Sequence, residues 1–118
     1  MIYYERRYIV VRKNMTQLAD LGRSSEPGLL ILISLADGPK HGYAMMEDVE
    51  RLAGVRLGPG TLYGALARLE RLGLIEPLAS HDRRRPYRLT QSGAAALQAE
   101  LAQLERLAAA GLRRLATT

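Results

Sequence analysis

The apolar residues between Pro59 and Leu72 recur every three or four positions, which is the period of an α-helix that buries one face. Proline at the first helical position and glycine just after the last turn are typical helix boundaries, and Pro59 and Gly73 stand at these places. The apolar face comprises Leu62, Ala65, Leu66, Leu69 and Leu72. The opposite face comprises Thr61, Gly64, Arg68 and Arg71. We therefore expect one side of this helix to pack and the other to meet a partner.

Two short segments with alternating apolar residues follow this helix. Residues 74–80 and 87–89 have the alternation of strands, and Pro77 restricts the first of them to a sheet edge. The turn between them contains Arg83, Arg84 and Arg85. An isolated arginine run is more often a solvated loop than a binding site. Because this run directly follows a helix with a free basic face, the order predicts a two-stranded wing that contacts DNA.

Two further helices are predicted upstream. The short turn from the second of them to Gly58 has the spacing of a helix-turn-helix. The first begins after Ser24 and Ser25, which can cap it, and ends at residues 37–39. The second covers residues 41–52 and ends at Gly54. The expected buried side of the first helix is Leu29, Leu30, Ile33, Leu35 and Ala36. The expected inward residues of the second are Tyr43, Met46, Val49 and Leu52 or Ala53.

A long helix is predicted from Gln91 to about Leu115, with Thr90 as its N-cap. Its apolar stripe comprises Leu97, Leu101, Leu104, Ala108, Leu112 and Leu115. One domain of this size offers too little surface to cover such a stripe. A twofold dimer covers it by burying the same residues on both chains, whereas the alternative is a helix folded back on its own core. We expect the dimer.

Composition and charge are consistent with a nucleic-acid partner. The chain has 118 residues, enough for one domain, and 47% are hydrophobic although Phe and Trp are absent. The net charge of +5 alone would also suit a membrane surface or simple solubility. The location of the positive charge favours a nucleic-acid partner, because residues 58–90 hold six arginines against three acidic residues.

Several classes of function are disfavoured by the sequence. Cysteine is absent, which excludes disulfides and thiolate zinc sites, and the two histidines, His41 and His81, lie far apart without carboxylates at metal-ligand spacing. The serines lack partners in any catalytic pattern, and there is no phosphate-binding glycine loop. No apolar run approaches the roughly 20 residues that span a bilayer. We expect a cytoplasmic protein without enzymatic activity, cofactor, metal or membrane partner.

Several short motifs resemble those of a known family when taken in order. They are His41-Gly42-Tyr43, Pro59-Gly60-Thr61-Leu62-Tyr63, Gly73-Leu74-Ile75, Arg85-Pro86-Tyr87-Arg88-Leu89-Thr90 and Gly93. Together they are similar to the PadR-like transcriptional regulators, from about Pro27 to the C-terminus. The resemblance implies a mainly α fold with a small β-hairpin wing: a winged helix-turn-helix followed by a single C-terminal dimerisation helix. It further implies a homodimer that binds a promoter operator in double-stranded DNA, usually as a repressor released by a small molecule or other signal.

Particular residues are assigned to these roles. The expected DNA-binding residues are Tyr43, Thr61, Tyr63, Gly64, Arg68, Arg71, Arg83, Arg84 and Arg85. Among them Arg68 is the leading candidate for a base contact, because arginine can form two hydrogen bonds with guanine. Tyr87 is expected to attach the wing to the body. The expected dimerisation residues are Leu97, Leu101, Leu104, Ala108 and Leu112.

The predicted organisation has three parts: an N-terminal extension or arm (1–24), the winged helix-turn-helix domain (25–90) and the dimerisation helix (91–118). Residues 1–14 depart from the family pattern, and their apolar content favours an arm or an added dimer contact over a plain disordered tail. Winged helices do not all bind DNA. The alternative function is therefore a winged-helix module that binds another protein through the same basic face.

Overall fold

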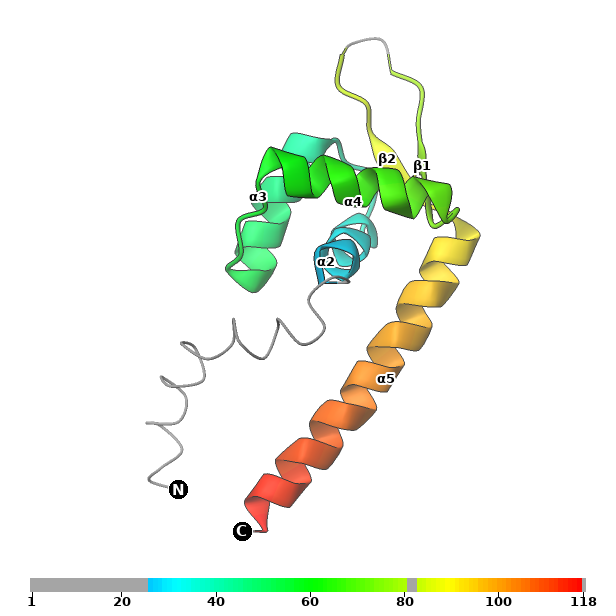
Figure 1. Ribbon diagram of the computed structural model, residues 1–118. Helices are drawn as coiled ribbons and strands as arrows, with labels where there is room; N and C mark the ends of the chain where they lie inside the picture. The colour runs from blue at the N-terminus through cyan, green and yellow to red at the C-terminus, as the bar shows by residue number, and fades with distance from the viewer. Residues whose placement is uncertain (1–25, 81–82, 118) are drawn as a thin grey trace.

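The structure is a computed structural model that describes residues 26–80 and 83–117. Its helices are α2 (Glu26–Leu35), α3 (Gly42–Ala53), α4 (Pro59–Arg71) and α5 (Gln91–Ala116), and its strands are β1 (Ile75–Pro77) and β2 (Tyr87–Leu89). Helices α2, α3 and α4 form the body, from which the hairpin projects on one side while α5 extends away on the other (Figure 1). The predicted fold class, a mainly α winged helix-turn-helix with a long C-terminal helix, is confirmed. The predicted arm, the Ser24–Ser25 cap and His81 lie outside the described residues.

Local sequence signals explain where the helices begin and end. The backbone N–H of Gly93 donates to the Thr90 hydroxyl at 2.9 Å, which caps α5 as predicted. Pro59 occupies the first turn of α4. Gly54 and Gly73 follow α3 and α4 with φ angles of 67° and 76°, left-handed values that glycine adopts without steric cost.

The core lies where α2, α3 and α4 meet the base of the wing and the start of α5. It is formed by Ile31, Leu32, Leu35, Met45, Val49, Leu57, Leu62, Ala65, Leu66, Leu69, Ile75 and Leu97. In α4, four of the five residues predicted to pack are buried. The fifth, Leu72, is 63% exposed because it caps the helix beyond its last packed turn.

The predicted buried faces of the two upstream helices were partly wrong. In α2 the buried apolar residues include Ile31 and Leu32, while Ala36 is exposed. This helix is apolar almost all round, so its sequence pattern does not define which side faces inward. In α3 the buried residues are Gly42, Met45 and Val49, and both Tyr43 and Leu52 are exposed.

The wing is a two-stranded antiparallel sheet, as predicted, in which Ile75 pairs with Leu89 and Pro77 with Tyr87. Tyr87 is half-buried against the core, which confirms that it attaches the wing to the body. At the other end of β2, the Thr90 N–H donates to the Leu74 carbonyl at 3.1 Å, and the Thr90 hydroxyl donates to the Gly73 carbonyl at 2.6 Å. The strand end and the start of α5 are thus fixed together.

Only the beginning of α5 packs on the body of its own chain. Leu97, predicted to lie in a dimer interface, is buried instead in the protomer's own core, because the first turns of α5 lie against α2 and β2. Beyond it the leucines are exposed by 39% or more: Leu101, Leu104, Leu107, Leu112 and Leu115. Ala108 is also exposed. None of the helices in the described ranges combines the length and apolarity that crossing a membrane requires.

Candidate nucleic-acid interface

Helix α4 presents the outer face that its sequence predicted. Its buried side chains, Leu62, Ala65, Leu66 and Leu69, fix the helix to the core. Thr61, Gly64, Arg68 and Arg71 are all exposed. Gly64 stands in open space, because a methyl group at this position would have no neighbouring atom within 4 Å. The helix backbone can therefore approach a partner closely at Gly64.

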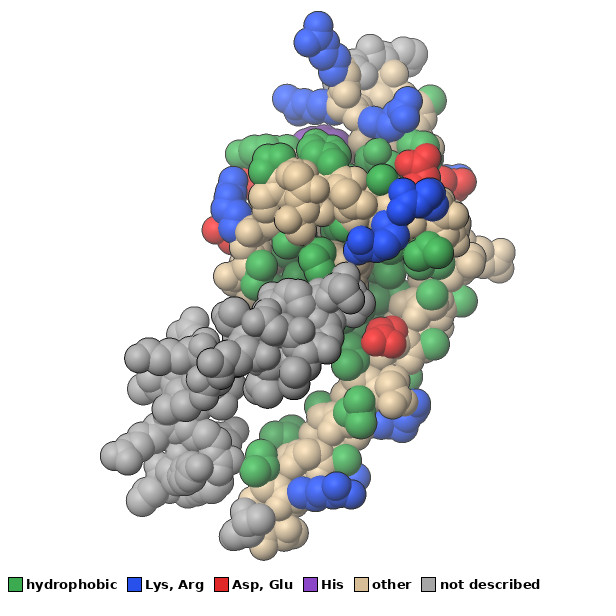
Figure 2. Space-filling model, viewed as in Figure 1, with side chains coloured by type: hydrophobic (Ala, Val, Ile, Leu, Met, Phe, Trp, Pro, Cys, Tyr) green, Lys and Arg blue, Asp and Glu red, His purple; other side chains and the backbone are tan. Residues whose placement is uncertain are grey.

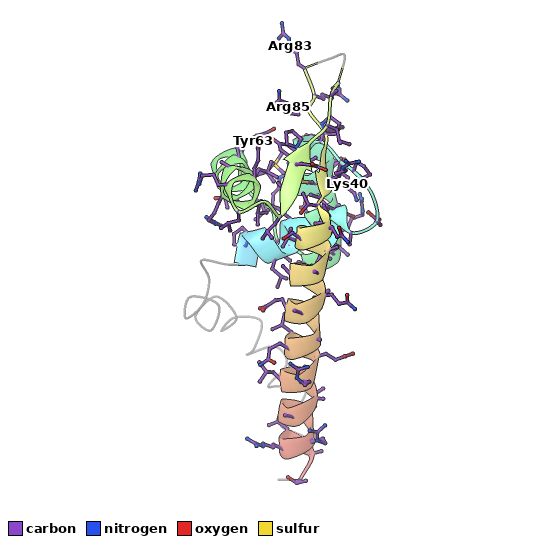
Figure 3. The ribbon with its side chains drawn as sticks, turned by 90° about the vertical axis from the view of Figure 1, so that its right-hand side faces the viewer. Lys40, Tyr63, Arg83 and Arg85 are labelled. Carbon is purple, nitrogen blue, oxygen red and sulfur yellow. The ribbon has the colours of Figure 1, made fainter. Side chains whose placement is uncertain are left out.

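The wing carries three exposed arginines above this helix. Arg83, Arg84 and Arg85 follow the turn, and Figure 3 shows Arg83 near the tip and Arg85 lower down, above Tyr63. In the space-filling view, basic side chains lie on the visible face of the end of the molecule that carries the wing (Figure 2). Arg88, farther down, is engaged with Glu76 on the neighbouring strand at 2.7 Å.

A groove of about 570 Å³ joins the wing to the helix-turn-helix. Its walls are His41, Gly42, Tyr43, Tyr63, Arg83, Arg84, Arg85 and Tyr87. Five of the nine predicted DNA-binding residues thus lie together, drawn from α3, α4 and the wing. Among the residues that the structure describes, the lining holds three guanidinium groups and no carboxylate. Such a groove suits a chain of phosphates, with tyrosine hydroxyls as additional donors.

The histidine-glycine-tyrosine motif has a structural explanation. Nδ1 of His41 accepts a hydrogen bond from the Ala44 N–H at 3.4 Å and caps α3. A methyl group at position 42 would lie 2.7 Å from the hydroxyl oxygen of Tyr63, so glycine makes room for this ring. The sequence did not predict the role of Gly42, because the contact joins two motifs that are distant along the chain.

The structure separates Arg68 from the groove. Its guanidinium Nη2 would lie 4.0 Å from a methyl group at Gly28 in α2, and Arg68 lines a second groove with Leu72 and Glu100. Each residue turns an α-helix by about 100°, so Arg68 is on the flank of the outer face and Gly64 nearer its centre. The assignment of Arg68 as the base-contacting residue stays a prediction.

This fold and surface define a winged helix-turn-helix protein with a basic side. The chain belongs to the transcriptional regulator PadR-like family, whose model matches residues 31–99. The family resemblance predicted from the motifs is confirmed. The family consists of DNA-binding regulators of transcription, not enzymes.

Proteins that are similar to this chain include regulators of transcription. The chain is 41% identical over 83 residues to the transcriptional regulator Rv3488 of Mycobacterium tuberculosis, a match that covers 68% of this chain and 77% of the relative. It is 48% identical over 85 residues to an uncharacterized 37.1 kDa protein in transposon TN4556 of Streptomyces fradiae, a match that covers 72% of this chain and 25% of that protein. A PadR family transcriptional regulator from Eggerthella lenta has a similar structure, with a TM-score of 0.71, 26% identity and full coverage of both chains.

Proposed function

We propose that the protein is a cytoplasmic, dimeric repressor that binds an operator in double-stranded DNA and responds to a small molecule or another signal. The observation that carries this proposal is the groove in which Arg83, Arg84 and Arg85 stand beside Tyr43 and Tyr63. In this proposal the three arginines contact DNA phosphates, because phosphate contacts supply most of the sequence-independent affinity of a DNA-binding protein.

In this proposal α4 enters the major groove and the wing contacts the adjacent DNA backbone. A major groove about 12 Å wide admits an α-helix, and contacts to base edges there distinguish all four base pairs. Thr61, Gly64 and Arg71 would face the bases or the groove edge, while the groove beneath the wing takes the neighbouring phosphates. Residues 25–90 then form the DNA-binding unit and residues 91–118 the dimerisation helix.

Dimerisation would use the exposed stripe of α5. Leu101, Leu104, Ala108 and Leu112 are apolar residues that the protomer leaves uncovered. A twofold dimer buries them and places two copies of α4 about one turn of DNA apart, roughly 10 base pairs. We expect the operator to be a palindrome with that spacing.

The test of the proposed function is a binding titration on genomic fragments recovered with the protein, performed at two salt concentrations. We expect the affinity to fall steeply as salt rises, because each phosphate contact releases condensed counterions. Absence of DNA binding at low salt would contradict the proposal and favour the alternative, a winged-helix module that binds a protein through the same face.

Arg68→Ala tests the predicted base contact. If the guanidinium moves onto a guanine, the substitution should weaken operator binding by about 1–3 kcal/mol and weaken binding to unrelated DNA less. Arg71→Ala removes the same charge from the same face of α4 and shows whether Arg71, rather than Arg68, makes the base contact. Equal losses on both DNAs for Arg68→Ala would reassign Arg68 to a phosphate contact.

Gly64 offers a test in which stability and binding should change in opposite directions. Gly64→Ala should stabilise α4 by up to about 1 kcal/mol, because alanine is the better helix former and its methyl group meets no neighbour. The same methyl group should weaken operator binding if the backbone lies close to the bases, and Gly64→Gln should weaken it more. Thermal melting and binding titrations measure the two effects. Unchanged affinity in both variants would show that the α4 backbone does not lie close to the bases at this position.

A further inference from the structure

The wing is attached to the body through the backbone of Lys40, in the connection between α2 and α3. The Lys40 N–H donates to the Tyr87 carbonyl at 3.1 Å, and the Tyr87 N–H donates to the Lys40 carbonyl at 2.9 Å. This antiparallel bridge occupies the edge of β2 that faces away from β1. One residue of the connection between α2 and α3 therefore extends the sheet of the wing.

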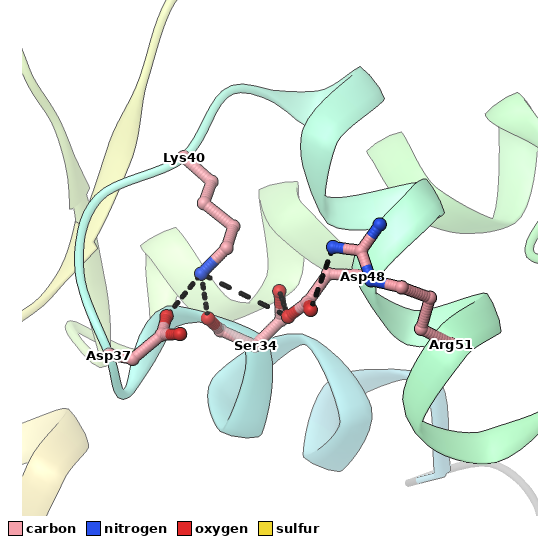
Figure 4. Close-up of polar contacts among 5 residues, drawn as sticks. All are labelled: Ser34, Asp37, Lys40, Asp48 and Arg51. Carbon is pink, nitrogen blue, oxygen red and sulfur yellow. Dashed lines mark hydrogen bonds and ion pairs between the residues drawn. The ribbon is translucent and has the colours of Figure 1, made fainter.

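The side chain of the same residue is held by both neighbouring helices (Figure 4). Its ammonium group donates to the backbone carbonyl of Ser34 in α2 and to the carboxylate of Asp37. It also lies 3.9 Å from the carboxylate of Asp48 in α3, and the Lys40 side chain is only 17% exposed. Lys40 is thus fixed by its side chain to the body and by its backbone to the wing.

A buried hydroxyl completes this network. Ser34 is 1% exposed, and its hydroxyl donates to the Asp48 carboxylate at 2.7 Å. Arg51 lies 3.3 Å from the other oxygen of Asp48. These five residues link α2, the connection between α2 and α3, and α3 itself. A change at Lys40 therefore affects the polar contacts between the two helices.

The charge of Lys40 matters at this place for two reasons. The last carbonyls of a helix lack partners within the helix, and a cation stabilises that end. The last turn of α2 has no basic residue of its own, and the Lys40 ammonium supplies the cation. The hydrogen bond and charge of Lys40 also lower the pKa of Asp37.

We propose that Lys40 is a positioning residue that fixes the wing relative to α4, so that the wing arginines and α4 engage one DNA duplex together. The strands of the wing are three residues each, and an isolated hairpin of this kind is marginally stable. Its orientation therefore depends on its attachments. The bridge to Lys40 is the attachment that joins it to the connection before α3.

This inference rests on the proposed function, in which the wing contacts DNA, and its first test needs no DNA. Lys40→Met keeps the length of the side chain and removes the charge. We expect amide hydrogen exchange at Tyr87 to accelerate about tenfold or more, because its N–H donates to the residue 40 carbonyl. Lys40→Arg, which keeps the charge, should restore most of the protection. Unchanged exchange at Tyr87 would overturn the proposal.

Arg56→Met is the matched control. Arg56 pairs with the exposed Glu50 at 2.7 Å, so this variant loses the same unit of charge and one ion pair without touching the wing. It should leave exchange at Tyr87 unchanged. Acceleration as large as that of Lys40→Met would mean that charge loss alone is responsible and would contradict the proposal.

The second test is a double-mutant cycle on DNA. Lys40→Met should lower affinity about tenfold in the full protein but have little effect when Arg83, Arg84 and Arg85 are already alanine, because residues that act through one another are not additive. Equal losses in both backgrounds would show that Lys40 acts independently of the wing.

If Lys40→Met fails to fold, Asp48→Asn replaces it in both tests. This variant keeps the shape of its side chain and should give smaller effects of the same sign. The two proposals can fail separately. If the triple alanine variant binds DNA like the wild type, the proposed function of the wing is wrong, whereas the exchange rate at Tyr87 still decides the role of Lys40.

Discussion

Replacing both Leu101 and Leu104 by glutamate is expected to yield a folded monomer that has lost its operator binding. Both leucines are about 40% exposed in the protomer, so the change costs its own fold little. In a twofold interface it would introduce four carboxylates, two from each chain, and unpaired charges are not buried there. A single subunit forfeits half of the contacts with the operator. Sedimentation and a binding titration measure the two losses.

The control for this variant places the same charges elsewhere on α5. Ala95→Glu with Ala99→Glu adds two carboxylates at exposed positions away from the leucine stripe. This control should remain dimeric and bind DNA. A folded Leu101→Glu, Leu104→Glu protein that stays dimeric would show that the proposed stripe is not the interface, and the N-terminal segment would become the next place to search.

Replacing Arg83, Arg84 and Arg85 together by alanine is expected to weaken binding to every duplex, with little change in sequence preference. Phosphate contacts make affinity fall with salt by about 0.9 logarithmic units per contact, so the salt slope should become shallower by up to about three times that amount. Titrations on operator and unrelated DNA over a range of salt concentrations measure this change. The fold should be unaffected, since all three side chains are exposed.

Three arginines of α5 provide the comparison. Arg106, Arg113 and Arg114 are exposed, and their replacement by alanine lowers the net charge by the same amount at a distance from the wing. This variant should keep the steep salt slope. Equal slopes for the wing variant and the wild type would show that the wing does not contact phosphates.

Much of the architecture was predictable because its signals are local. Pro59 and Gly73 delimit α4, Thr90 caps α5, and the alternation around the arginine turn defines the wing; each is a preference of a few adjacent residues. The inward side of α2 was not predictable in the same way. Residues 29–33 are all apolar, and only packing against α3 and α4 decides that Ile31 is buried.

The candidate site was predictable in its residue types but not in its grouping. The exposed tyrosines and the wing arginines follow from motifs, whereas their meeting in one groove depends on contacts between α3, α4 and the wing. The sequence did not predict a role for Lys40, because a single lysine in a turn forms no recognisable motif. Its bridge to Tyr87 joins residues 47 positions apart, and such pairings leave no periodic trace.

The junction between the wing and α5 has a mechanical consequence. Thr90 is the single residue between β2 and α5, and the Leu74 carbonyl would lie 1.9 Å from a methyl group at Gly93, so the first turn of α5 is seated directly on the end of the chain that leads into β1. This short connection restricts rotation of α5 relative to β2. In the proposed dimer, a tilt of α5 would therefore move the hairpin with it and change how far the wing arginines reach across DNA.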